Sequence, residues 1–257
     1  MRSSGPLVLL ILLFPSMGAG QAILNVEVLQ GEEVEGFHGE ISGRLRLASG
    51  NTDLVQVGGD VGIGHLSRRH WIRTYLGLER LEEEGKDVLY NRYLHLRYNY
   101  CFSPRARTFH FFQLQANRNL LLDQRRLLGS GIRARILGGA GNRLEVGTGL
   151  MLESERLNES RLAPGEDAST DAVRMANLLA GSGPVGEGNR WVTVVYYQPN
   201  VEGFRDYRLL GEVGLRAQIL ASLHVDLSVT WRHDSRAPAG LEPDDVEIKT
   251  GFTYSVG

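Results

Sequence analysis

Several kinds of residue are scarce in this 257-residue sequence, and each scarcity excludes a class of protein. Cys101 is the single cysteine, so the chain forms no internal disulfide, and we interpret Cys101 as an unreactive packing residue. Beyond residue 22 no segment approaches ~18 consecutive apolar residues, which argues against a transmembrane helix. The net charge is only -2, so nothing indicates a nucleic-acid partner. Lysine occurs only at Lys86 and Lys249, and arginine supplies the remaining positive charge.

The N-terminus has the pattern of a secretory signal peptide. Arg2 supplies a positive charge, residues 7–14 form an unbroken apolar run, and small residues allow cleavage between Ala19 and Ala22. The run is too short for the ~20 residues of a membrane-spanning helix. We therefore expect a signal peptide at residues 1–22, a periplasmic lead-in or extra strand at 23–35, and one β-barrel domain at 36–257.

From residue 36 onward, polar and apolar residues alternate with a period of two. The clearest example is residues 88–117, where two alternating runs flank Ser103-Pro104. Alternation of this kind is typical of a β-strand, which points successive side chains to opposite faces. The runs reach about a dozen residues, beyond the ~5–6 of an ordinary strand and near the ~9–11 that a tilted strand needs to cross a bilayer. The sequence therefore predicts long antiparallel hairpins.

The connections between the predicted strands fall into two classes that alternate along the chain. Those near 67, 104, 139, 186 and 221 are mostly short, and those near 50, 83, 121, 164, 201 and 238 include all the longest ones. Short periplasmic turns opposite longer outer loops are typical of membrane barrels. We predict an all-β fold, an antiparallel up-and-down transmembrane β-barrel of about 12 strands. A soluble β-barrel or sandwich is the alternative.

The alternation also assigns side chains to the two faces of the predicted barrel. The apolar and aromatic face is expected to meet outer-membrane lipid, through Leu94, Leu96, Tyr98, Tyr100, Phe102, Phe112, Leu114, Val225, Leu227, Val229, Trp231, Phe252 and Tyr254. The other face is expected to line the lumen, with the charged residues Arg44, Arg46, Asp60, Arg73, Glu79, Arg97, Arg133, Arg135, Glu145, Glu212, Arg216, Asp226, Arg232 and Lys249. Glu40, Glu153 and Glu247 are expected on the same face. Because cations and anions then nearly balance, we expect them to pair across strands.

No residue pattern supports catalysis, a metal site or a cofactor. His224, Asp226 and Ser228 share one strand face, but His and Ser would lie about 13 Å apart along the strand, whereas a nucleophile and its base need roughly 3 Å. The glycines of residues 181–186 match a dinucleotide-binding spacing, yet a strand follows where that motif requires a helix. We interpret both as structural features.

Three segments resemble one bacterial family. They are SGNTD at 49–53, NRYLHLRYNYCFSP at 91–104 and LLGSGIRARIL at 127–137. The sequence is similar to domain of unknown function 481, the YdiY-like, salt-induced outer-membrane β-barrel proteins, over roughly residues 36–257. The resemblance implies a barrel fold and a Gram-negative outer-membrane location, and it transfers no catalytic residues. Outer-membrane barrels commonly end on an aromatic residue recognised by the barrel-assembly machinery, whereas here Phe252 and Tyr254 precede a Ser-Val-Gly end.

We expect a non-enzymatic cell-envelope protein with a structural, stress-related or minor-pore role. Inward glycines such as Gly129 and Gly131 could leave a slim aqueous gap, so a small solute in the lumen remains a partner to consider. Two alternatives stay open: an outer-membrane enzyme acting on lipid, which needs a Ser–His pair close in space, and a soluble periplasmic ligand-binding barrel.

Overall fold

A computed structural model describes residues 35–48, 54–83, 86–139, 141–239 and 241–256. The predicted signal peptide and nearly all of the segment 23–35 therefore lie outside the described residues. Thirteen strands and two short 3-10 turns make up this part of the chain. The strands are β1 Gly36–Ala48, β2 Leu54–Ser67, β3 His70–Glu83, β4 Lys86–Ser103, β5 Ala106–Asn117, β6 Leu122–Gly139, β7 Asn142–Leu157, β8 Ser169–Met175, β9 Asn177–Pro184, β10 Asn189–Asn200, β11 Gly203–Leu220, β12 Leu223–Asp234 and β13 Asp244–Val256.

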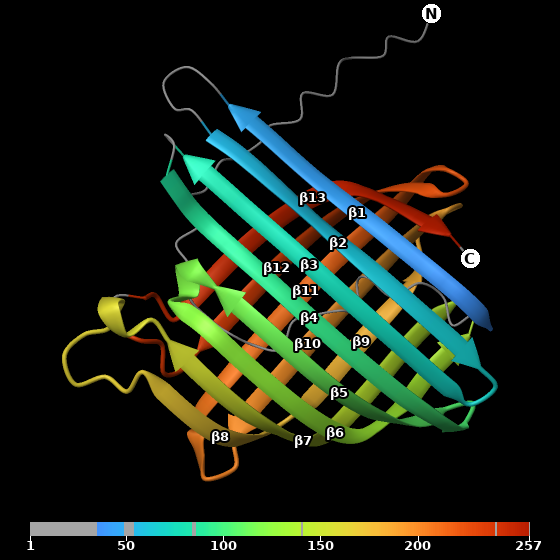
Figure 1. The fold of residues 1–257 in the computed structure, drawn as a ribbon. Coiled ribbons are helices and arrows are strands. Elements are labelled where there is room, and N and C mark those ends of the chain that lie inside the picture. The colour runs from blue at the N-terminus through green and yellow to red at the C-terminus, as the bar shows by residue number, and fades with distance from the viewer. Residues whose placement is uncertain (1–34, 49–53, 84–85, 140, 240, 257) are drawn as a thin grey trace, which may run out of the picture.

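The strands close into a single barrel (Figure 1). Apart from β8 and β9, consecutive strands pair antiparallel, and β1 pairs with β13 to close the ring, with Ile41 opposite Tyr254. A closed sheet leaves no unpaired edge, which is the condition for placing strands in lipid. The fold expected from the alternation is therefore confirmed.

The predicted strand at 173–180 is interrupted at Ala176, which separates β8 from β9. Both pieces pair with β7: β8 with residues 150–156 and β9 with residues 143–147. Counted as one interrupted strand, they bring the barrel to the twelve strands predicted from the sequence. An irregularity of this kind bends a strand locally and re-aims its side chains.

The longest connections lie at one end of the barrel, although that end also has the two-residue turn 201–202. The two-residue turns 68–69, 104–105 and 221–222 lie at one end, and the connections 158–168 and 235–243 lie at the other. These are the short-turn end and the long-loop end of the barrel. The 158–168 connection includes the short 3-10 helix η2, Glu159–Arg161, while η1, Arg118–Leu120, joins β5 to β6. Within the described ranges, no helix is long and apolar enough to cross a membrane.

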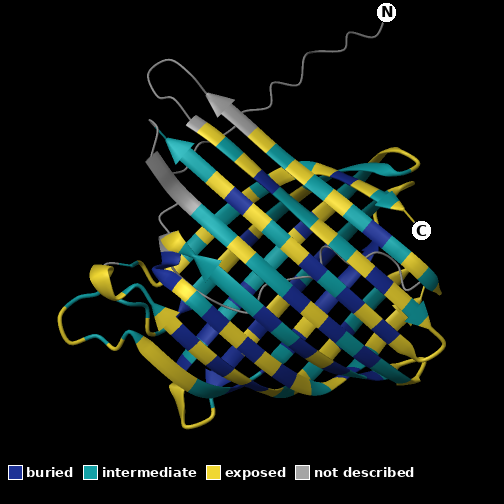
Figure 2. Ribbon diagram, in the orientation of Figure 1, coloured by how far each residue is buried: buried dark blue, intermediate teal, exposed yellow. Residues whose placement is uncertain are grey.

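Burial alternates along the strands, as Figure 2 shows in the chequered pattern of dark blue and yellow. On β3, Trp71, Arg73 and Tyr75 are buried, while Ile72 and Leu76 next to them are exposed. On β6, Leu127 is fully buried and its neighbour Leu128 is 57% exposed. The exposed apolar side chains thus lie on the outer wall, and the buried set fills the interior.

Candidate functional site

The charged residues predicted for the lumen lie on the inner side of the barrel wall. Arg73, Glu79, Arg97, Arg133 and Glu145 are buried. Others are half-buried, namely Arg44, Asp60, Arg135, Glu212, Arg216, Asp226, Arg232 and Lys249. Arg46 is paired opposite Gln56 in the sheet, but its side chain lies outside the described part of the structure.

The densest charge cluster surrounds Glu153 on β7, near the long-loop end. Its carboxylate accepts hydrogen bonds from Arg125 on β6 at 2.5 Å, Arg174 on β8 at 3.2 Å and Arg208 on β11 at 2.6 Å. Arg208 also pairs with Asp234 on β12 at 2.8 Å. β7 and β11 are not neighbours in the sheet, because β8, β9 and β10 lie between them, so this cluster links non-adjacent strands through the interior.

A second cluster gathers on Glu145 of β7, toward the short-turn end. Arg107 on β5 lies 2.8 Å from this carboxylate, Arg133 on β6 lies 2.5 Å from it, and Arg135 lies 3.5 Å from it. Arg73 on β3 extends toward the same region, with its guanidinium 3.6 Å from the ring centroid of Trp71. Burying charges is costly unless they are paired and hydrogen-bonded, and this arrangement meets that condition.

The remaining inner wall, from β11 through β1 to β4, carries partly exposed ion pairs. Arg216 joins Asp226 at 2.7 Å and Glu40 at 2.8 Å, which links β11, β12 and β1. Lys249 bridges Glu79 at 3.3 Å and Glu247 at 3.0 Å. Further pairs are Arg44 with Asp60, Arg232 with Asp245, and Arg232 with Glu247. Because cations and anions are intermixed on these strands, the described side chains of this wall form no ring of one charge sign, which is one of the features that make a pore selective.

Apolar side chains fill the interior between β5 and β11. The buried cluster comprises Phe109, Phe111, Leu127, Met151, Ala176, Leu178, Ala180, Val194, Tyr196 and Leu210. The cavity between this cluster and the polar residues His95 and Arg97 measures only about 10 Å³, close to the volume of a single water probe. In this sector the barrel is packed like a protein core.

The inward glycines Gly129 and Gly131 do not leave the aqueous gap considered from the sequence. A side chain at Gly129 would overlap the ring of Phe111, and one at Gly131 would meet the ring of Phe109 and the backbone of β7. The glycines therefore make room for two phenyl rings from the neighbouring strand. That expectation was wrong at these two positions, because the volume that glycine omits is taken up by large side chains of β5.

The residues predicted to meet lipid are exposed or half-buried on the outer wall. Leu96, Phe102, Leu227, Val229, Trp231, Phe252 and Tyr254 are 40–59% exposed. Leu94, Tyr98, Tyr100, Phe112, Leu114 and Val225 have intermediate exposure. Many further apolar side chains share this surface, including Leu45 at 69% and Ile132 at 59% exposed. The outer wall is thus an extended apolar surface, far larger than the patches a soluble monomer normally exposes.

The sequence motifs weighed for catalysis do not assemble into a site. On β12, Asp226 bonds to Arg216 and Thr253 rather than to His224 or Ser228. Gly181 and Gly183 lie in β9, and β10 follows them, so the glycine spacing belongs to a hairpin. No cluster of three or more potential metal ligands occurs among the described residues.

One serine–histidine contact does occur, on the outer wall. Ser130 Oγ on β6 lies 2.9 Å from His110 Nδ1 on β5, and His110 Nε2 lies 3.1 Å from Thr108 Oγ1. In hydrolytic triads the second ring nitrogen is oriented by a third group, most often a carboxylate. Here that position is taken by a hydroxyl, and Ser130 lies between Leu128 and Ile132, both more than half exposed on the apolar surface.

The prediction from sequence missed Arg125, Arg174 and Arg208. It started the strands that carry Arg125 and Arg208 too late, and it treated the strand that carries Arg174 as a weak one. The alternation at Gly129, Gly131 and Arg133 extends back through Leu127 to Arg125 with the same parity. Likewise, Leu210 and Arg208 share the inner parity of β11. Extending each pattern to the neighbouring loop would have found them, whereas the apolar interior on β9 and β10 gives no polar alternation to follow.

The fold is similar to solved outer-membrane barrels. A NanC porin aligns with a TM-score of 0.52 at 5% identity, covering 84% of this chain and 98% of that one. The COG4313 outer membrane channel from Pseudomonas putida F1 aligns with a TM-score of 0.52 at 12% identity, covering 88% and 97%. The translocator domain of autotransporter NalP from Neisseria meningitidis gives 0.50 at 12% identity, covering 85% and 86%. At these identities the likeness shows the fold, an outer-membrane-type β-barrel.

No curated protein sequence matches the chain. A family model does match, over residues 44–256, which is nearly the whole barrel. Its description is "Protein of unknown function, DUF481", the family that the three sequence segments had indicated. The chain therefore belongs to the DUF481 family.

Proposed function

We propose that this chain is an outer-membrane barrel with a mainly structural role in the cell envelope, and that it conducts ions weakly and with little selectivity. The observation that carries the proposal is the filled interior. Between β5 and β11 the apolar cluster leaves about 10 Å³ next to His95 and Arg97. A hydrated ion needs a continuous wet path, and this sector offers it little room.

The outer wall supports insertion into lipid. Its apolar side chains alternate with inward-facing side chains along the strands, and on many strands the inward side chains are paired charges, as in membrane barrels. A soluble ligand-binding barrel would need the opposite arrangement, a polar outer wall around an apolar cavity. The similarity to outer-membrane barrels agrees with insertion.

The ion-pair clusters support the structural role. The Glu153 cluster joins β6, β7, β8, β11 and β12 across the interior. Such cross-links resist deformation of the barrel, which suits a protein that acts as a wall element under envelope stress. A porin and an outer-membrane channel share this architecture at low identity, so an open solute pathway is the competing function.

Two measurements test the proposal. Membrane fractionation should recover the protein with outer membranes, and the unheated protein should migrate differently on gels from the heated one. Planar-bilayer recordings on the refolded protein should show small or rare openings with little ion preference. Recovery in the soluble periplasmic fraction would overturn the location, and large, steady, strongly selective openings would establish a specific pore instead.

A further inference from the structure

A groove rich in arginine lies at the long-loop end, where β4, β5 and β6 meet the connection that follows β7. Its volume is about 570 Å³. Its lining includes the side chains of Tyr90, Arg92, Arg118, Asp123, Asn158 and Arg161. We call it the arginine groove. Tyr90 and Arg92 project from the outer face of β4, since they share the parity of Leu94 and Leu96. The groove therefore opens toward the surroundings of the barrel rather than into its interior.

The groove carries a surplus of positive charge. Arg92, Arg118 and Arg161 are all exposed. Among the described lining residues the one carboxylate is that of Asp123, which accepts a hydrogen bond from Asn158 Nδ2 at 3.2 Å. Three guanidinium groups around one engaged carboxylate favour an anion. The planar donors of arginine match the oxygens of a phosphate group.

Backbone and packing contacts hold the groove together. Arg161 Nη1 donates to the carbonyl of Arg118 at 3.4 Å, and the backbone N–H of Asn158 donates to the carbonyl of Leu121 at 2.7 Å. Leu122, which lines the groove, and Leu120 are buried against Leu157 and Leu241. On the β4 side, the Arg92 guanidinium lies 5.7 Å from the centroid of the Tyr90 ring. The segments that carry the arginines are thus docked against one another.

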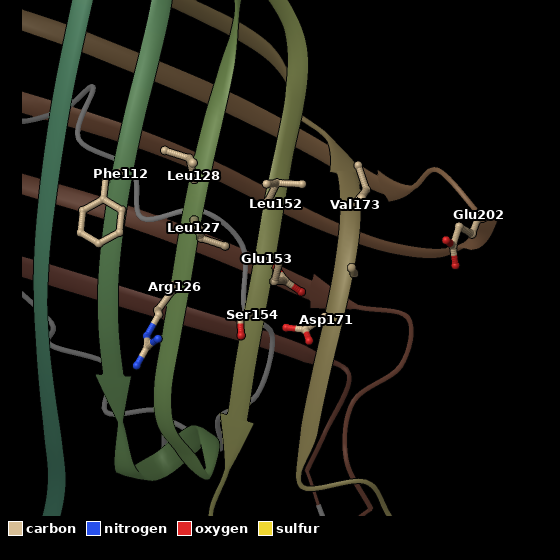
Figure 3. A pocket seen from close by; sticks show the side chains of 11 residues that line it. Phe112, Arg126, Leu127, Leu128, Leu152, Glu153, Ser154, Asp171, Val173 and Glu202 are labelled. Atoms are coloured by element: carbon tan, nitrogen blue, oxygen red, sulfur yellow. The ribbon is translucent and has the colours of Figure 1, made fainter.

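Next to the groove along β5 and β6, the outer wall becomes apolar. The groove therefore lies at the border of the apolar surface. Figure 3 shows this neighbouring surface, a depression of about 400 Å³ whose apolar lining includes Phe112, Leu128, Leu152 and Val173. Arg126 and Ser154 mark its polar edge. Asp171 and Glu202 also line this depression, so an anionic group is favoured in the arginine groove and not here. An acyl chain suits the apolar part of the wall.

We propose that the arginine groove binds the phosphorylated headgroup of a glycolipid in the outer leaflet, with its acyl chains lying on the apolar wall of β5–β8. The occupant follows from charge and position together: a phosphate at the groove and hydrocarbon beside it belong to one amphipathic molecule. Basic pockets at the edge of a membrane-embedded surface recognise anionic lipid headgroups in this way. This inference rests on the proposed insertion of the barrel into the outer membrane.

The test compares two lipids that differ only in phosphate. The full chain is refolded in detergent micelles and mixed with bis-phosphorylated lipid A or with its dephosphorylated form, and bound lipid is measured by native mass spectrometry. The phosphorylated lipid should be retained preferentially. The triple variant Arg92→Gln, Arg118→Gln, Arg161→Gln should weaken its binding roughly tenfold or more. A matched control, Arg69→Gln with Arg105→Gln, removes exposed arginines at the short-turn end and should leave binding unchanged.

Each of the following outcomes would overturn one part of the proposal. Equal binding of the two lipids by a folded barrel, or equal loss in the control variant, would remove the phosphate site while leaving the barrel's role intact. Displacement of the lipid by millimolar inorganic phosphate would make the site one for free phosphate. Heat-dependent gel migration is recorded for the wild type and for every variant, so that lipid binding is compared only between folded barrels. A wild-type chain that never forms a barrel would overturn the proposed function itself.

Discussion

Arg208 on β11 donates to Glu153 on β7 at 2.6 Å, although the two residues are 55 positions apart and their strands are not adjacent in the sheet. This contact crosses the barrel interior. The same carboxylate also accepts from Arg125 and Arg174. The Glu153 side chain therefore connects β6, β8 and β11. Its removal leaves three buried guanidinium groups without this shared negative charge.

We expect Glu153→Gln to destabilise the folded barrel by about 3–5 kcal/mol, because it breaks a buried charge network by removing one partner. Urea unfolding of the protein in lipid vesicles would measure the change. The control is Glu82→Gln, whose partner Arg80 is exposed and 3.3 Å away; that variant should change stability by about 0–1 kcal/mol. A small effect of Glu153→Gln would mean that the cluster contributes little to the stability of the barrel in the membrane.

Leu96→Arg should cost about 2–4 kcal/mol in folding into lipid vesicles, because it places a charge on the outer wall near the middle of β4. Leu96 is 40% exposed and its strand neighbours His95 and Arg97 are buried. Leu96→Ile keeps the surface apolar and serves as the control. If both variants fold into vesicles equally well, Leu96 does not meet hydrocarbon and the assignment of faces is wrong.

Phe111→Ala should raise the single-channel conductance in planar bilayers. Phe111 lies over Gly129 in the packed interior, and truncation of its ring opens space beside the 10 Å³ cavity that it lines. Phe112→Ala is the matched control, since the next residue of β5 faces the outer wall and should leave conductance unchanged. Unchanged conductance in Phe111→Ala would show that the route for ions, if any, runs along the charged wall of β11–β4.

Ser130 should not react with a fluorophosphonate probe for nucleophilic serines. Its partner His110 contacts Thr108 through the other ring nitrogen, where a hydrolase places a carboxylate. Labelling of the wild-type protein that disappears in both Ser130→Ala and His110→Ala would favour the lipid-acting enzyme over the structural role. Labelling that survives Ser130→Ala would come from another serine.

Much of the architecture could be predicted because the strands of a barrel produce a local alternation of polar and apolar residues. Period-two alternation over about a dozen residues specifies a strand with one apolar and one polar face, and the alternation of short and long connections specifies up-and-down order. The start of β1 at Gly36 and the turns after Ser67 and Ser103 follow directly from these signals. The split at Ala176 could not be predicted, because it depends on how β8 and β9 pair with β7.

The sequence by itself determined the fold class, the strand number and the parity of most side chains, since each of these depends on neighbours two residues apart. Only the tertiary structure decided what the interior contains. Whether Gly129 leaves a gap or receives the Phe111 ring depends on the register between β5 and β6. Whether Arg208 reaches Glu153 depends on the curvature of the closed wall, which brings the non-adjacent strands β7 and β11 close enough for their side chains to pair. Closure and register are properties of the whole barrel, so no local pattern records them.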